Sequence, residues 1–204
     1  MASVLTAPAA GATPSAVPDG WEVVEGVELQ GVPGKLDASQ APSLTGNNVS
    51  AQAAEAELLA VQSVRNSRFV ATEVNYPAPN TGLLRARSAE YGGSWEGFAF
   101  QWDEVSQTWS LRSLANDLYV AVEKNFTGDS QNVLRARSAS VGGWEQFHLF
   151  YNEELQRWSL QSTLNGLFVA MENSYSGSLQ YALRARSTDV GGSWEQFVLY
   201  NLEA

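Results

Sequence analysis

Hydrophobic and polar residues alternate over short stretches through most of the chain beyond residue 57. Residues 109–113, 118–123, 133–138 and 145–150 are four consecutive examples, with turn-forming residues between them. Successive side chains of an extended chain point to opposite faces, so a period of two is typical of a strand with one buried face. Turn residues between such stretches end one strand before the next begins. The pattern therefore predicts a series of short β-strands joined by turns.

Three sequence motifs return in the same order at spacings of 49 or 50 residues. Leu-Arg-Ala-Arg-Ser begins at residues 84, 134 and 183, Trp-Glu at 95, 144 and 194, and aromatic-Val-Ala at 69, 119 and 168. Such self-similarity indicates three copies of one structural unit. Four strands in each copy make twelve, which is the layout of a β-trefoil, where six strands close a barrel and six cap it as hairpins. We expect an all-β fold with a β-trefoil over residues 58–204.

The same motifs carry a family resemblance. The succession of aromatic-Val-Ala, Glu, Leu-x-Ala-Arg, Gly-Gly and Trp-Glu-x-Phe over residues 58–204 resembles the fascin-like branch of the β-trefoil proteins. That branch includes actin-bundling proteins and accessory modules of bacterial glycoside hydrolases. Gln-x-Trp at residues 107–109 and 156–158 also matches a signature of ricin-type lectins, although the first copy lacks it. The resemblance implies the fold and leaves the activity open, because one fold hosts many functions.

Residues 1–57 differ from the repeats, and we expect them to form a flexible, acidic leader. Residues 1–18 are mostly small, polar or proline residues that cannot nucleate a core. Residues 19–33 contain a strand-like segment, in which apolar residues alternate with glutamates. Its apolar face, expected to dock on a partner protein, consists of Trp21, Val23, Val27 and Leu29. A lone strand of this kind needs a surface to bury its tryptophan, either on its own domain or on a partner.

Charge and composition exclude several classes of function. The net charge is −10 and the pI about 4.5, so binding to nucleic acid or to an anionic membrane is not expected. No apolar run approaches the roughly 20 residues of a membrane span, so membrane insertion is not expected either. The absence of cysteine removes disulfides and thiolate chemistry, and the single histidine, His148, is expected to be a structural or surface residue. No clustered acids or phosphate-binding motifs are present. We therefore expect a protein without enzymatic activity, cofactor or metal.

Charged residues recur at equivalent positions of the three copies. Two arginines alternate along each Leu-Arg-Ala-Arg strand, which puts both guanidinium groups on one face, within reach of carboxylates on neighbouring strands. We expect structural ion pairs rather than a site for acidic ligands. The residues concerned are Arg85, Arg87, Arg135, Arg137, Arg184, Arg186, Glu73, Glu96, Glu123, Glu145, Glu172 and Glu195.

An aromatic residue also recurs in the loop after the second strand of each copy, and Asn or Ser precedes it. An exposed ring can stack on the apolar face of a sugar while neighbouring polar groups bind its hydroxyls. Alternatively, the rings pack over the end of the barrel as a satellite core. The candidate carbohydrate-binding residues are Asn75, Tyr76, Asn125, Phe126, Ser174 and Tyr175.

Two functions fit these observations. The first is a secreted adaptor whose N-terminal strand docks on a partner protein, since strand addition is a common mode of recognition. The second is a lectin-type module with up to three pseudo-equivalent glycan sites. Residues 7–12 have the small-residue character of a signal-peptide cleavage region, which favours a secreted bacterial protein. Alternatively, this run is an ordinary Ala/Pro linker.

The layout of a small trefoil with an extended acidic leader is similar to that of the linking subunit of Streptomyces umbrella toxin particles. This resemblance concerns layout and involves no motif. It implies a secreted, actinobacterial subunit of a toxin complex, with its leader in a cleft of a neighbouring lectin-like subunit and its body on a stalk subunit.

Overall fold

The computed structural model describes residues 12–26, 29 and 56–202, so most of the predicted leader, including Val27, lies outside the described residues. Within that part, the structure consists of β-strands and two short 3-10 turns, and it contains no helix long and apolar enough to cross a membrane. The elements are β1 (Glu22–Val24), β2 (Glu57–Ser63), β3 (Arg68–Glu73), β4 (Leu83–Ser88), β5 (Gly97–Asp103), β6 (Thr108–Ser113), β7 (Tyr119–Val122), η2 (Gly128–Ser130), β8 (Leu134–Ser138), β9 (Phe147–Asn152), β10 (Arg157–Ser162), β11 (Phe168–Met171), η3 (Gly177–Leu179), β12 (Leu183–Ser187) and β13 (Phe197–Asn201).

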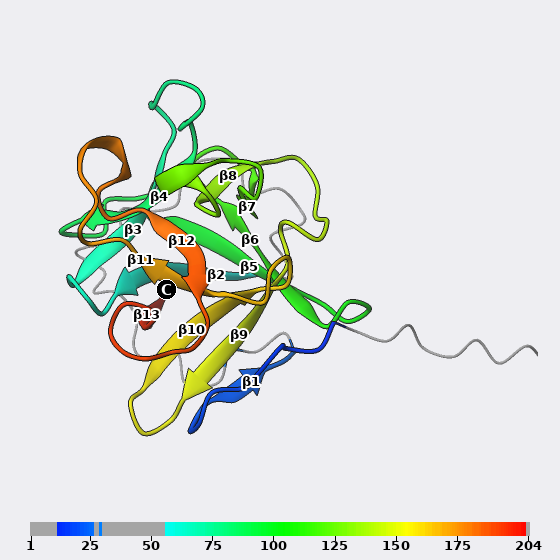
Figure 1. Ribbon diagram of the computed structural model, residues 1–204. Helices are drawn as coiled ribbons and strands as arrows, with labels where there is room; N and C mark the ends of the chain where they lie inside the picture. Colours follow the sequence, from blue (N-terminus) through cyan, green and yellow to red (C-terminus); the bar gives the residue numbers. More distant parts are fainter. Residues whose placement is uncertain (1–11, 27–28, 30–55, 203–204) are drawn as a thin grey trace, which may run out of the picture.

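Six of these strands close into a barrel (Figure 1). They pair in the ring order β2, β5, β6, β9, β10 and β13. The ring is completed by β13, which returns to β2 in a register running from Phe197↔Ser63 to Asn201↔Leu59. The first strand of the first copy and the last strand of the third copy are therefore direct neighbours.

Apart from β1, the remaining six strands form the hairpins β3–β4, β7–β8 and β11–β12, which meet around a pseudo-threefold axis at one end of the barrel. Each hairpin donates one backbone hydrogen bond to the neighbouring copy. These bonds run from Ala86 N to Tyr181 O (2.9 Å), from Ala136 N to Gly82 O (2.8 Å) and from Ala185 N to Asn132 O (3.0 Å). Three equivalent contacts of this kind give the arrangement expected of a β-trefoil.

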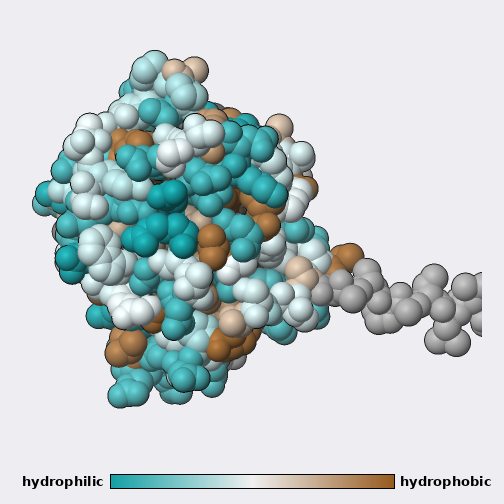
Figure 2. Space-filling view, in the orientation of Figure 1, coloured by the Kyte–Doolittle hydropathy of each residue, from teal (hydrophilic) through white to brown (hydrophobic). Residues whose placement is uncertain are grey.

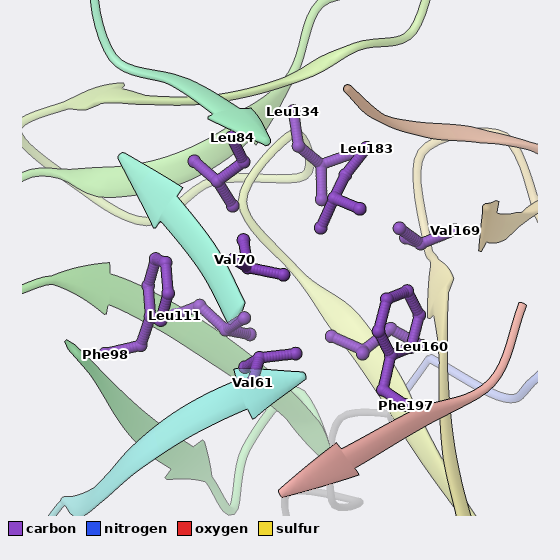
Figure 3. A pocket seen from close by; sticks show the side chains of 10 residues that line it. All are labelled: Val61, Val70, Leu84, Phe98, Leu111, Leu134, Leu160, Val169, Leu183 and Phe197. Atoms are coloured by element: carbon purple, nitrogen blue, oxygen red, sulfur yellow. The ribbon is translucent and has the colours of Figure 1, made fainter. Parts of the chain in front are cut away.

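Apolar side chains from all three copies fill the space between the barrel and the hairpins (Figure 3). Equivalent positions contribute in threes, for example Leu84, Leu134 and Leu183. A small cavity remains among these side chains, and its lining residues are all Val, Leu or Phe. Such a cavity offers no side-chain hydrogen bond to a polar ligand, so we treat it as a packing gap in the core.

Strand β1 belongs to none of the three copies. It pairs with β9 in an antiparallel register centred on Val23↔Phe150. In the first copy β2 runs along β5 for four residue pairs, whereas β6 meets β9 at the single pair Trp109↔Phe147. The edge of β9 that β6 leaves free is the edge that β1 occupies. A domain boundary at residue 57 thus assigns to the leader a strand that the structure places in the main sheet.

We expect a variant that begins at residue 56 to keep its β-sheet but to unfold at a lower temperature than the full chain. Truncation removes Trp21, which is 7% exposed, and leaves its aromatic neighbours open to water. Removing a buried aromatic side chain costs about 3–5 kcal/mol, and each kcal/mol lowers the midpoint by roughly 2–4 °C at this size. Circular dichroism should show an unchanged spectrum and a midpoint about 6–20 °C lower. An unchanged midpoint would mean that β1 adds nothing to stability.

Candidate functional site

The N-terminal segment, defined here as residues 12–24, lies along β9 of the second copy (Figure 1). Because side chains alternate along a strand, His148, Phe150 and Asn152 share the face of β9 that points away from the barrel core. Each of these three side chains contacts the segment. The segment therefore covers the outer face of β9, while β1 pairs with the edge of the same strand.

Trp21 anchors the segment through aromatic packing. Its side chain lies against Phe150 and Phe168, and the half-buried Val23 and Val190 pack around this cluster. The Phe150 and Phe168 rings are 5.4 Å apart between centroids and inclined by 55°. Tilted aromatic contacts of this kind add to the free energy gained from burial alone. The cluster fixes the middle of the segment on the trefoil.

Side chains of the trefoil also hold the backbone of the segment. The bonds run from Asn152 Nδ2 to Gly20 O (2.8 Å), from Trp109 Nε1 to Val24 O (2.7 Å) and from Ser15 N to Gln161 Oε1 (3.3 Å). Gln161 Nε2 donates in turn to the Ser15 hydroxyl at 3.0 Å. Contacts to main-chain atoms fix the path of the segment and depend little on most of its side chains.

His148 lies beneath this segment and is 4% exposed. Burial lowers the pKa of the His148 ring below its ordinary value, while a hydrogen bond to the Thr13 backbone acts in the opposite direction. Burial dominates, so the neutral ring is the favoured form here.

The apolar face of the predicted strand was expected to dock on a partner protein, and the structure gives a different place for the part it describes. Trp21 lies on the chain's own trefoil, Val23 is half-buried beside it, and Leu29 joins the core cluster of the barrel. Val27 lies outside the described residues. The same chain supplies the surface that Trp21 needs, so its burial does not require a partner.

The outer face of β9, which binds the segment, differs from the equivalent faces of the other two copies. Where the second copy has His148, the first has Ala99 and the third has Val198. From the sequence, a structural or surface histidine was expected here, and the structure places it in a buried position. Its contact with Thr13 could not be inferred, because Thr13 lies in a stretch of small residues without periodicity.

One glutamate of each copy lies buried between two arginines. Glu73 Oε1 accepts from Arg87 Nε at 2.6 Å and from Arg85 Nη1 at 3.1 Å. The equivalent sets are Glu123 with Arg135 (2.9 Å) and Arg137 (2.7 Å), and Glu172 with Arg184 (3.8 Å) and Arg186 (2.5 Å). Each glutamate side chain is 5% exposed. These arginines are engaged within the protein, which weakens the case for a site for acidic ligands.

The first arginine of each set also reaches the neighbouring copy. The bonds run from Arg85 Nε to Gln180 O (2.6 Å), from Arg135 Nε to Thr81 O (3.0 Å) and from Arg184 Nε to Gln131 O (2.6 Å). The ion pairs of one copy are thereby linked to the loop of the next around the pseudo-threefold axis.

The second repeated set of glutamates departs from the ion pairs expected for it. Glu96 accepts from the Ser88 hydroxyl at 2.7 Å and from Gly92 N at 3.2 Å. Glu145 accepts from Gly142 N (2.9 Å) and Glu195 from the Ser187 hydroxyl (2.6 Å). Glu96 and Glu145 thus hold the Gly-Gly loops of their copies. The alternation of charges along the strands did not reveal this, because backbone N–H groups carry no sequence signal.

The candidate carbohydrate-binding aromatics lie in equivalent loops but are partly packed inside. Tyr76 and Phe126 are half-buried against a satellite cluster, with the Arg85 and Arg135 guanidinium groups 5.6 and 5.5 Å from their ring centroids. The Tyr175 hydroxyl pairs with Arg184 Nη1 at 2.5 Å, and burial together with the Glu172 carboxylate raises the Tyr175 pKa. The polar residues that precede the rings, Asn75, Asn125 and Ser174, are exposed.

No three His, Asp or Glu side chains come close enough to hold a metal ion within the part of the chain that the structure describes. No protein-family model and no curated protein sequence matches the chain.

Several solved structures share its architecture. ThreeFoil, a designed threefold-symmetric protein, aligns with a TM-score of 0.57 at 17% identity over 71% of this chain and 98% of its own. The ricin B-like lectin of Macrolepiota procera, solved with lactose, aligns at 0.53 and 13% over 71% and 95%. The protein is a β-trefoil. A mosquitocidal holotoxin aligns at 0.58 and 10% over 73% of this chain, which spans 17% of that toxin. At such identities the likeness establishes the fold alone.

The paired arginines lead to a graded prediction for the free energy of unfolding. Arg137→Ala should cost about 1 kcal/mol, because Arg137 is 33% exposed and Glu123 keeps Arg135. Replacing Arg135 and Arg137 together should cost about 3–5 kcal/mol, since Glu123 is then buried without a cation. Urea denaturation measures both values, with the more exposed contact of Arg157 as control through Arg157→Ala. A double variant as stable as Arg137→Ala would disprove the shared-carboxylate arrangement.

Proposed function

We propose that this protein is a non-catalytic adaptor, in which a rigid trefoil body carries an N-terminal segment that binds a partner protein. The observation that carries the proposal is the separate attachment of this segment. It belongs to none of the three copies, and it is held by pairing with one strand edge, by one aromatic anchor and by hydrogen bonds with side chains of the trefoil. The repeated charged groups of the trefoil are instead engaged with one another.

A strand attached at an edge is suited to exchange between two surfaces. The segment pairs with β9 over three residues, and most of its other contacts are backbone hydrogen bonds, the Ser15 hydroxyl and the packing of Trp21 and Val23. A partner with a free strand edge and an aromatic pocket could form the same kinds of contact. Attachment to its own trefoil would shield Trp21 until that partner is present. The partner's affinity is then reduced by the free energy needed to detach the segment.

The visible surface of the body supports this division of roles. On the face shown in Figure 2, hydrophobic residues form small separate patches among hydrophilic ones. The exposed large hydrophobic residues of the described chain are Val17, Val105, Val141 and Leu155. Broad apolar patches mark the obligate interfaces of many proteins. The scattered distribution on this face favours the segment as the main recognition element.

The setting that we propose is a secreted protein complex of actinobacterial origin, such as a bacterial toxin assembly. The small-residue run at 7–12 supports secretion, and a mosquitocidal holotoxin is among the structurally similar proteins. In such an assembly the segment would contact one subunit and the trefoil body another.

Trp21→Ala tests the adaptor proposal, because the two roles of Trp21 predict opposite changes in the affinity for the partner. If Trp21 anchors the partner, the variant should bind it more weakly by at least about 2 kcal/mol, the size of an interface hot spot. If Trp21 serves only its own trefoil, the variant should bind as well as or better than the wild type, because its segment is already free. The partner would be captured from culture supernatant of the source organism and titrated by calorimetry. The matched control is Trp95→Ala, in the loop between β4 and β5.

Binding of carbohydrate is a second candidate, favoured by the three equivalent loops. Each presents a half-buried ring, with an exposed Asn or Ser beside it. In two of them an arginine stacks on the ring, and in the third an arginine hydrogen-bonds its hydroxyl. Rings fixed in this way lose little freedom when a sugar stacks on them. Structurally similar trefoils include lectins solved with lactose or with a sialylated epitope.

If the loops bind glycans, changing Tyr76, Phe126 and Tyr175 together to Ala should lower the response on a glycan array at least about tenfold. The control is the double change Tyr76→Phe and Tyr175→Phe, which keeps the rings and should keep binding, as Phe126 occupies the equivalent position. Equal responses from the triple-Ala variant and the wild type would exclude these loops as the glycan site.

A further inference from the structure

His148 departs from the threefold pattern at the point where the N-terminal segment is attached. It is the only histidine of the sequence, and the equivalent residues of the other copies are Ala99 and Val198. The ring shares the outer face of β9 with Phe150, on which Trp21 packs. His148 is therefore an ionisable group on the outer face of β9, where the other residues bind the segment by packing or by neutral hydrogen bonds.

The segment covers the His148 ring. The ring hydrogen-bonds to the backbone of Thr13, and its cross-strand neighbour Gln161 bonds to Ser15. Ala12 N donates to Ser106 O at 3.0 Å on the adjacent hairpin. These bonds hold residues 12–15 against the trefoil, and the histidine is 4% exposed beneath them.

The charged groups on the strands packed against β9 do not neutralise a cation at this position. They are Glu22 of β1, Arg112 of β6 and Arg157 of β10. The covering segment adds Asp19, and the hairpin to which Ala12 bonds adds Glu104 and Asp103, which accepts from Ser106. Within the part of the chain that the structure describes, no carboxylate forms an ion pair with His148, and the pKa of the ring is governed by burial and by Thr13. A buried imidazolium would therefore lack both water and a counter-ion.

We propose that His148 is an acid-sensitive latch, whose protonation releases residues 12–24 from the outer face of β9. Release lets water reach the charged ring, and it exposes Trp21, Phe150 and the edge of β9 at the same time. The inference concerns the protein alone, so it holds whether or not the segment also binds a partner.

The direction of the pH dependence follows from the two protonation states. A histidine whose pKa is lowered in the docked form favours docking at pH values above its ordinary pKa of about 6.5. As the pH falls below that value, the released form gains protons that the docked form does not bind. Between pH 7.5 and pH 5.5 the equilibrium constant for release should rise by up to about tenfold, the limit for one histidine whose pKa in the released form is about 6.5.

The test uses the full chain and two measurements. Hydrogen exchange by mass spectrometry, corrected for intrinsic rates, reports the protection of residues 12–24 at pH 7.5 and 5.5. NMR follows the single histidine through its isolated ring resonance, which gives its pKa directly. We expect protection to fall by up to about tenfold on acidification in the wild type. In Trp21→Ala, where the anchor is lost, the histidine should titrate at a higher pH than in the wild type.

Two variants make the latch falsifiable. His148→Gln keeps an amide donor that cannot titrate, and His148→Val installs the residue of the third copy, Val198. In either variant that still protects residues 12–24 at pH 7.5, the protection should no longer depend on pH. An acid-induced loss as large as in the wild type would overturn the proposal, as would equal histidine pKa values in wild type and Trp21→Ala. Neither outcome would bear on partner binding, which the calorimetric titration of Trp21→Ala measures separately.

Discussion

The buried glutamate shared by two arginines is the interaction on which the rest of the trefoil depends. A carboxylate inside a protein is costly unless cations and hydrogen-bond donors surround it. Glu73 has both through Arg85 and Arg87, and Arg85 also bonds to a carbonyl of the third copy. The other two copies repeat the arrangement. No hairpin can shift along the axis without disturbing its own glutamate and the loop of its neighbour.

Around this symmetric centre, the outward-facing residues of the second copy differ from those of the first. The trefoil presents three equivalent outer faces, on β5, β9 and β13, yet the described N-terminal segment lies on β9. There the outward residues are an imidazole, a phenyl ring and an amide, whereas the first copy has Ala99, Gln101 and Asp103. Inward positions stay apolar in all three copies because they share one core. Divergence is thus tolerated on the outside, where each face has its own surroundings.

The fold could be predicted from the sequence because each of the three copies specifies the same structural unit. Each copy supplies its own strands, turns and Leu-Arg-Ala-Arg motif, so an error in one strand does not change the architecture. The alternation of Trp21 and Val23 with glutamates also indicated a half-buried strand, and β1 is one. The alternation could not indicate which surface buries that strand, because no sequence motif marks β9 as the partner of β1. The contacts of Glu96 with a backbone N–H and of His148 with Thr13 were equally invisible, since main-chain groups are the same at every residue.

The pairing of β13 with β2 has a consequence for how the molecule is made. These strands lie at opposite ends of the repeat, and the barrel has a free edge until they meet. Contacts between such distant parts of a chain slow folding, because a long loop must close before they form. When a ribosome has completed two copies, β2 can already pair with β5, but its edge toward β13 is still free. During synthesis that edge is available to other chains until the third copy emerges.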